Sequence, residues 1–275
     1  MKLKTLIGDA FENKYAIGAF NFYNLESALA IVQASLRKEQ PVIMMVTETS
    51  IEYAGLDNLC SIFQNEKSRS GANIYLHLDH GKDVELIKEC IDLKFDSVMF
   101  DGSSLAFEQN VTISSELRKY AHKKGVLFEA EIGRVGGTED NISSELFKTN
   151  PQEALNFYQQ AKPDLLAVAI GNIHGYKTAS EQLDLSLLAK IQDTLKGPLV
   201  LHGCSNRENR EYAIAIGEGI VKINIDTELR EAFIDGASKA FRSKEKDPRK
   251  FLASSLTEMQ KRVETKIDVF SKSCC

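Results

Sequence analysis

Eight short apolar runs, most of them rich in β-branched residues, recur along the 275-residue chain with longer amphipathic stretches between them. Runs of this kind are typical of buried strands, and the stretches between them have the apolar spacing of surface helices. Strands that alternate with helices favour repeated βα units and a parallel sheet. Eight such units predict a (β/α)₈ TIM barrel of the α/β class, because an open doubly wound sheet seldom needs so many strands.

We expect a single domain over residues 1–275, since no linker, low-complexity segment or strong repeat divides the chain. The predicted strands span residues 16–21, 42–47, 74–79, 97–101, 126–131, 165–170, 199–202 and 220–224. The predicted helices span residues 25–36, 84–93, 111–122, 151–161, 185–195, 206–216 and 227–241. A charged connector and a C-terminal helix follow within residues 242–275, and the apolar face of that helix would cover the barrel floor or join a subunit interface.

The composition narrows the class of partner. A net charge of −5 without a dominant basic stretch argues against nucleic acid. Five scattered cysteines without a CxxC pair predict neither a disulfide framework nor a cysteine-ligated zinc site, and they favour a reducing cytoplasm. The first eight residues lack the apolar core of a signal peptide, and no apolar run reaches the roughly 18 residues that a membrane span needs, so we expect no membrane partner.

Histidines gather where the predicted strands end. Four of the five histidines lie at or just beyond the end of an apolar run, and three of these, His80, His174 and His202, are each followed by glycine. Functional side chains of a TIM barrel collect at the carboxyl ends of its strands, and catalytic zinc takes three protein ligands. We therefore expect these three imidazoles to bind one Zn²⁺. A single histidine would more often be a packed core or loop residue, but three at equivalent positions favour the metal.

Asp79 and His77 share the strand that ends in His80. A carboxylate beside a zinc ligand suits a general acid or base, so Asp79 is the candidate for proton transfer, with orientation of a histidine as the alternative role. His77 is then a packing residue or a support for the ligands. Strand alternation points Asp79 and His80 to opposite faces, so both reach one end of the barrel only if the strand bends out of register at Gly81.

Two further features surround this rim. The loop after the fifth strand begins with Gly136 and Gly137, and its carboxylate Glu139 is the candidate for a group that acts only when the loop closes; a solvated acidic loop is the alternative. Phosphate commonly binds after strands seven and eight of a barrel. The residues there are Gly203, Cys204 and Ser205 after strand seven, and Asn224, Ile225, Asp226 and Thr227 after strand eight. Each segment alone is also a common turn or helix cap.

Taken together, the motifs resemble those of the class II, metal-dependent ketose-bisphosphate aldolases, which include the fructose- and tagatose-bisphosphate enzymes. The matching segments occur in the family's order and are residues 77–81 (HLDHG), 97–103 (SVMFDGS), 129–133 (EAEIG) with Gly136 and Gly137, 169–175 (AIGNIHG), 201–203 (LHG) with Ser205, and 221–227 (VKINIDT). They span most of the chain, so the resemblance is far more specific than any single motif.

The resemblance implies a zinc-dependent aldolase that cleaves a phosphorylated ketose to dihydroxyacetone phosphate and an aldehyde such as glyceraldehyde 3-phosphate. It assigns zinc to His80, His174 and His202, and the proton of the hydroxyl that becomes the aldehyde to Asp79. It gives Asp101 and Glu131 a second or displaced metal ion, and Glu139 the carbon-bound proton of dihydroxyacetone phosphate. The ketose-phosphate site would comprise Gly175, Gly203, Ser205, Asn224, Asp226 and Thr227, with a monovalent cation nearby. A homodimer or homotetramer is expected.

Some residues depart from the family's pattern. Cys204 and Asn206 flank the serine of the presumed phosphate loop, and Asn172 and Ile173 precede the zinc histidine where smaller residues are usual. These changes leave the substrate open between fructose, tagatose and other phosphorylated sugars or deoxy sugar acids. Two further readings stay open: a zinc hydrolase that activates water at the same metal, and a metal-binding barrel that has lost catalysis.

Overall fold

Eight parallel strands close into a barrel in the computed structural model of the chain, which describes residues 1–139, 142–175 and 182–272. Around the barrel the strand order is β1-β11-β10-β8-β5-β4-β3-β2. The strands are β1 (Ile17–Asn21), β2 (Val42–Val46), β3 (Ile74–Gly81), β4 (Ser97–Phe100), β5 (Leu127–Ile132), β8 (Leu165–Val168), β10 (Leu199–Leu201) and β11 (Ile220–Ile225). These are the eight strands that the sequence predicts, so the TIM-barrel fold is confirmed.

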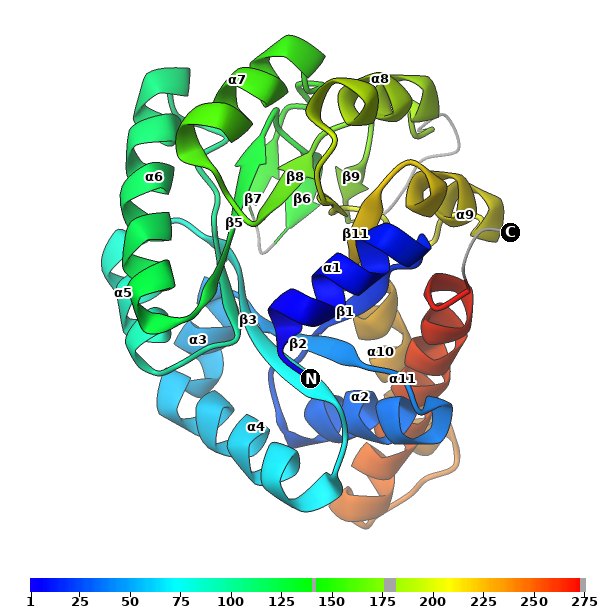
Figure 1. Cartoon of the computed structure of the whole chain (residues 1–275). Helices are drawn as coiled ribbons and strands as arrows, with labels where there is room; N and C mark the ends of the chain where they lie inside the picture. Colours follow the sequence, from blue (N-terminus) through cyan, green and yellow to red (C-terminus); the bar gives the residue numbers. More distant parts are fainter. Residues whose placement is uncertain (140–141, 176–181, 273–275) are drawn as a thin grey trace.

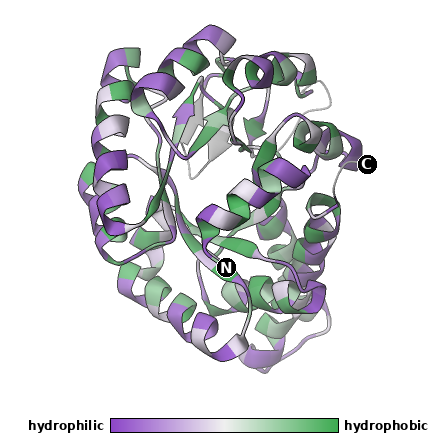
Figure 2. Cartoon of the chain, viewed as in Figure 1, coloured by the Kyte–Doolittle hydropathy of each residue, from purple (hydrophilic) through white to green (hydrophobic). Residues whose placement is uncertain are grey.

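Helices surround the barrel (Figure 1), and their apolar faces turn toward the strands while their polar faces turn outward (Figure 2). They are α1 (Leu3–Asn13), α2 (Leu25–Lys38), α3 (Glu48–Ala54), α4 (Leu56–Ser70), α5 (Val84–Asp92), α6 (Phe107–Lys124), α7 (Pro151–Ala161), α8 (Leu185–Leu195), α9 (Asn209–Gly217), α10 (Thr227–Arg242) and α11 (Pro248–Phe270). Within the described residues, none of these helices combines the length and the apolarity that crossing a membrane requires.

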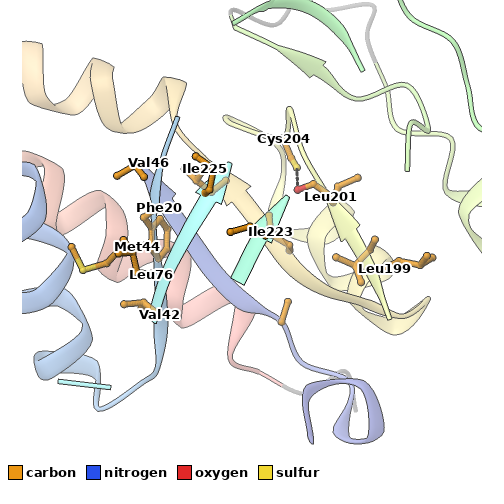
Figure 3. Close-up of a cluster of buried hydrophobic side chains, with 14 of the residues drawn as sticks. Phe20, Val42, Met44, Val46, Leu76, Leu199, Leu201, Cys204, Ile223 and Ile225 are labelled. Atoms are coloured by element: carbon orange, nitrogen blue, oxygen red, sulfur yellow. Dashed lines mark hydrogen bonds between the residues drawn. The ribbon is translucent and has the colours of Figure 1, made fainter. Parts of the chain in front are cut away.

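The core has two apolar layers, because successive strand residues face opposite sides of the barrel wall. In β2, Val42, Met44 and Val46 belong to the layer between the strands and the outer helices (Figure 3). Ile43 and Met45 belong to the layer inside the barrel. A strand buried on both faces explains why β2 is apolar throughout and shows no polar alternation.

The floor of the barrel, where the strands begin, is closed by α1, which lies across this opening (Figure 1). Its buried residues Leu3, Leu6, Ile7 and Ala10 recur at helical spacing and pack into the inner apolar layer. The C-terminal helix was predicted to cover the barrel floor or to join a subunit interface, and the floor is covered by α1 instead. Helix α11 packs against α10 and α2 on the outside of the barrel.

A small sheet stands apart from the barrel and carries one of the candidate ligands. It consists of β6 (Gly136–Glu139), β7 (Ile142–Ser144) and β9 (Ile173–His174), in the order β7-β6-β9. In this sheet Gly137 pairs with His174. The sheet therefore ties the loop after β5 to the segment that follows β8.

Candidate active site

Strand β3 ends in a bulge that brings two adjacent side chains to the site. Its pairing with β4 runs from Leu78 opposite Val98 to Gly81 opposite Phe100, so β3 contains one extra residue. His80 takes up this residue in a left-handed conformation, with φ of 48°. The bend that the sequence required at Gly81 is present. Such a backbone conformation is costly for a residue with a side chain, and it persists where the surrounding structure enforces it.

The imidazoles of His80 and His202 face each other across the mouth of the barrel. His80 Nε2 lies 2.8 Å from His202 Nδ1. The third imidazole, His174 on β9, lies beside them, with its ring centroid 5.0 Å from that of His80 and 6.4 Å from that of His202. Its nitrogens are not within 4.8 Å of the ligand atoms of both His80 and His202. Residues far apart in the sequence are thus brought together at the carboxyl ends of the strands, as the sequence predicts.

Carboxylates hold the far nitrogen of both facing rings. His80 Nδ1 donates to Asp101 Oδ2 at 3.1 Å, and His202 Nε2 donates to Glu129 Oε1 at 2.9 Å. When a neutral imidazole donates through one nitrogen, its other nitrogen carries a lone pair. The two nitrogens that face each other at 2.8 Å are therefore both acceptors. Two lone pairs arranged in this way would bind a cation, and carboxylate-oriented imidazoles of this kind are the usual ligands of zinc.

Carboxylates add to this donor set. The ligand atoms of Asp79, His80 and His202 lie within 4.8 Å of one another, and so do those of His80, Asp101 and Glu131. Burial, followed by the charge of Asp101, raises the pKa of Glu131 to about 8, and its buried Oε2 has no hydrogen-bond partner among the described residues. Burial opposes ionisation of Asp101, but hydrogen bonds from His80 and Ser103 hold its pKa below the usual value. The residues present therefore fit a bound divalent cation.

Asp79 lies beside the imidazole cluster and is almost completely buried. Its Oδ1 accepts a hydrogen bond from Asn224 Nδ2 at 2.8 Å and lies 3.7 Å from His202 Nδ1. Asn224 Nδ2 also lies 3.2 Å from His202 Nδ1. Asn224 thus fixes the orientation of the carboxylate relative to the imidazole, and the Asp79 carboxylate lies directly next to the candidate metal site.

Behind His202, a buried network joins His77, predicted as a packing residue or a support for the ligands, to Glu129 and Lys222, for which no role was predicted. Lys222 Nζ donates to Glu129 Oε2 at 2.8 Å and to His77 Nε2 at 3.2 Å. His77 Nδ1 in turn donates to Ser97 Oγ, 2.7 Å away. Burial and then the charge of Lys222 hold the pKa of His77 well below its usual value, so this ring is neutral. Charged residues in the middle of the apolar runs, such as Lys222, were the available signal.

A narrow pocket opens beside Asp79, and most of the predicted phosphate-binding residues line it. Its lining consists of Asn21, Asp79, Ile173, His174, Gly175, His202, Gly203, Ser205, Asn224, Asp226 and Thr227. Cys204 and Ile225 are exceptions: their side chains lie in the apolar layer outside the strands (Figure 3). The thiol of Cys204 points back to the backbone oxygens of Leu201 and His202. The side chains of these two residues do not line the pocket, so the predicted contact with substrate would fall to their backbone groups.

Asn21 is a pocket residue that the sequence treated only as the end of a strand. It is the last residue of β1 and is 2% exposed. Neither its amide nitrogen nor its amide oxygen has a hydrogen-bond partner among the described residues. Buried polar groups are normally paired, so an unpaired amide that lines a pocket is positioned to bind a ligand.

The unusual residues around the site have structural roles. Asn172 is fully buried and donates to the backbone oxygen of His202, so it joins the ends of the two segments that carry candidate ligands. Asn206 adopts a left-handed conformation, and its backbone N–H donates to Glu228. Gly137 has φ of 93°, and a Cβ there would lie 2.2 Å from the backbone oxygen of His174. Glu139 ends β6, and its side chain lies outside the described part of the structure.

The chain is similar to known proteins over nearly its whole length. The sequence profile of the family described as "Fructose-bisphosphate aldolase class-II" matches residues 1–273. A fructose-bisphosphate aldolase of Streptococcus pneumoniae serotype 4 is 37% identical, with 95% of this chain and 94% of the relative covered. A sulfofructosephosphate aldolase of Alkalicoccus urumqiensis is 34% identical, with coverages of 97% and 95%. The crystal structure of the YdjI aldolase from Escherichia coli K12 matches with a TM-score of 0.88 at 27% identity, covering 99% of this chain and 97% of that chain.

Proposed function

The chain belongs to the class II fructose-bisphosphate aldolase family, whose members are lyases, and we propose that it reversibly cleaves a phosphorylated ketose of the fructose- or tagatose-1,6-bisphosphate type. The products would be dihydroxyacetone phosphate and an aldehyde such as glyceraldehyde 3-phosphate. One observation carries the proposal: the far nitrogens of His80 and His202 are each held by a carboxylate, so their lone pairs converge beside Asp79.

His80, His174 and His202 would hold one Zn²⁺, and Asp101 and Glu131 offer a second position next to His80. The bound ion would polarise the ketone and stabilise the enediolate that forms on C–C cleavage. Lys222 lies inside the barrel, but its amine is engaged by Glu129 and His77, which is unsuitable for a lysine that must attack a carbonyl.

Protein side chains supply the proton transfers. Asp79, oriented by Asn224, takes the proton of the hydroxyl that becomes the aldehyde and returns it in the condensation direction. We assign the carbon-bound proton of dihydroxyacetone phosphate to Glu139. Gly175, Gly203, Ser205, Asp226 and Thr227 line the pocket beside these groups and would bind the ketose phosphate, with a monovalent cation nearby. Helix α10 begins at Thr227, and its positive end favours a phosphate there.

A direct test measures cleavage of several ketose phosphates by the zinc-loaded protein and by chelator-treated protein, with the Asp79→Asn variant alongside. We expect the triose products only with zinc, and a loss of kcat in the variant. Full activity after complete zinc removal would overturn the proposal. Release of inorganic phosphate without an aldehyde would instead identify a hydrolase, and a zinc-saturated but inert protein would identify a barrel without catalysis.

A second substrate class deserves the same assay, because one relative is named a sulfofructosephosphate aldolase and is 34% identical over 97% of this chain. A ketose phosphate that ends in a sulfonate would use the same metal and the same proton transfers. The two substrates would differ only in how the distal anion is held. A comparison of kcat/KM for the two ketoses would decide between them.

We further propose that the protein is a homodimer or homotetramer of the reducing cytoplasm. Ile234 and Phe241 are 62% and 78% exposed and lie two turns apart on α10, which supports a self-association surface. The thiols of Cys60, Cys90 and Cys204 are not in disulfides, which supports a reducing compartment. Light scattering of the wild type and of the Phe241→Glu variant tests the assembly; an unchanged mass would remove this surface from consideration.

A further inference from the structure

A hollow of ≈ 800 Å³ lies at the barrel floor, at the opposite end from the candidate active site. Its walls come from the first residues of β3 and β5, the ends of α4, α5 and α6, and the first turn of α1. This volume falls within the roughly 300–1,000 Å³ of small-molecule sites. The hollow is therefore large enough for a ligand of its own.

The lining of this hollow is strongly basic in a chain whose net charge is −5. It contains five lysines and one carboxylate, namely Lys2, Lys4, Lys67, Lys94, Lys124 and Asp96. Asp96 is already engaged, because its Oδ2 lies 3.1 Å from Lys67 Nζ and accepts a hydrogen bond from the backbone N–H of Leu76 at 2.9 Å. The only carboxylate of the lining therefore cannot neutralise the remaining lysines.

Three of the lysines lack an ionic partner. Lys124 Nζ lies 2.9 Å from Asp92, outside the lining. Lys94 Nζ donates to the backbone oxygen of Lys124 at 3.1 Å, and its charge acts on Asp92 only from beyond ion-pair distance. Across the residues for which the structure gives positions, no carboxylate lies within ion-pair distance of Lys2, Lys4 or Lys94. Positive charge over a concave, low-dielectric wall focuses the potential into the hollow.

Helix electrostatics explain some of these lysines but not others. Lys124 ends α6 and Lys94 lies two residues beyond α5, and the negative end of a helix dipole favours cations at such positions. Lys2 and Lys4 lie at the opposite, positive end of α1. That end has no acidic residue in its first turn and no side-chain cap, so its own dipole disfavours both lysines. An anion in the hollow would remove this conflict.

We propose that the floor hollow binds a small polyanion with two or more linked phosphate groups. Three lysines without an ion pair and the start of α1 match three or more negative charges, whereas a single phosphate carries at most about two at neutral pH. The ligand would lie apart from the substrate, because α1 and the inner apolar layer separate the two ends of the barrel. Pyrophosphate and a nucleoside triphosphate share the required chemistry, and the test distinguishes them.

The test is calorimetric titration of the zinc-loaded full chain with pyrophosphate, ATP and adenosine at low ionic strength. We expect saturable binding of pyrophosphate and ATP, and none of adenosine. The Lys4→Glu/Lys94→Glu variant should bind pyrophosphate and ATP at least about tenfold more weakly, while its ketose cleavage stays unchanged. The matched control is Lys190→Glu/Lys250→Glu, which reverses two exposed lysines elsewhere and should bind as the wild type does. Tighter binding of ATP than of pyrophosphate would identify the nucleotide as the ligand.

Hydrogen exchange locates the bound anion. We expect pyrophosphate to protect amides of residues 71–76, 94–96 and 124–127. Equal affinity in the Lys4→Glu/Lys94→Glu variant, or protection confined to residues 203–206 and 224–227, would overturn the proposal, because the anion would then bind at the active site. Binding of adenosine as tight as that of ATP would overturn it as well.

Discussion

Lys222 and Glu129 form an ion pair inside the barrel, with Nζ 2.8 Å from Oε2 and both side chains fully buried. Residues 93 positions apart in the sequence thus neutralise each other below the candidate metal site. A buried charge is tolerated when it is paired and hydrogen-bonded, and Glu129 uses its second oxygen to accept from His202. The pair therefore links the stability of the barrel to the orientation of a ligand.

Removal of Lys222 is expected to destabilise the fold strongly. Lys222→Met leaves the Glu129 carboxylate buried without its cation, and we expect a loss of about 3–5 kcal/mol in the free energy of unfolding. Glu129→Gln should be destabilising for the converse reason. The double variant should lose clearly less than the sum of the two single losses, as measured by urea unfolding. Additive losses would show that the two charges are not coupled.

The hydrogen bond from His202 to Glu129 should also tune metal affinity. Replacement of a carboxylate that orients a ligating imidazole typically costs about 10–100-fold in affinity. We expect a loss of this size in Glu129→Gln, measured by competition with a chromogenic zinc chelator. Glu153→Gln, in the exposed first turn of α7, is the control and should leave the affinity unchanged. Equal zinc affinity in both variants would contradict the role of Glu129.

Asn21 should matter for substrate and not for stability. Its amide has no protein partner among the described residues, so Asn21→Ala should change the free energy of unfolding by less than about 1 kcal/mol. Loss of one neutral hydrogen bond to a ligand should raise KM by up to about tenfold. Asn110→Ala is the matched comparison, because Asn110 is also buried but bonds to Glu131 and Ser114. The reverse pattern, a stable Asn110→Ala and an unfolded Asn21→Ala, would refute this assignment.

Asp184 should stabilise α8 in a pH-dependent way. It caps the helix through the N–H of Leu187, and hydrogen bonds from Lys148 and then from that N–H lower its pKa from 3.8 to about 2. A depressed pKa in the folded state adds stability above the unfolded pKa and loses it as the pH falls. We expect Asp184→Ala to cost about 1 kcal/mol near neutral pH, with a smaller cost at about pH 3. Asp184→Asn keeps the cap but cannot ionise, so its stability relative to Asp184→Ala should stay constant in acid.

Most of the barrel could be predicted from the sequence, because a strand buried on both faces is mostly apolar. The helices at residues 151–161 and 185–195 match α7 and α8 to the residue. Boundaries were less certain where a turn intervenes: α9 begins at Asn209 and not at Asn206, whose left-handed backbone excludes it from a helix. Helix α1 was not predicted, because its four buried residues can be recognised as a packing face only when the open floor of the barrel is known.

Candidate site residues at the ends of strands could be predicted from the sequence. Those within the strands could not. His80, His174, His202 and Asp79 stand out because imidazoles and carboxylates rarely end apolar runs by chance. Glu129 and Lys222 each interrupt an apolar run, and their pairing depends on β5 and β11 facing each other across the barrel interior, a relationship that spacing along the chain does not express. The side chains of Cys204 and Ile225 face away from the pocket, because a segment beside a pocket presents only alternate side chains to it.

The bulge at the end of β3 carries both the candidate proton-transfer group and a candidate metal ligand on one rigid segment of backbone. Asp79 and His80 are joined by one peptide bond, and the left-handed residue turns both inward without any intervening hinge. The distance between Asp79 and His80 is thus set by covalent geometry and does not depend on the conformation of neighbouring loops. Surface segments around the mouth can consequently diverge while Asp79 and His80 keep their spacing.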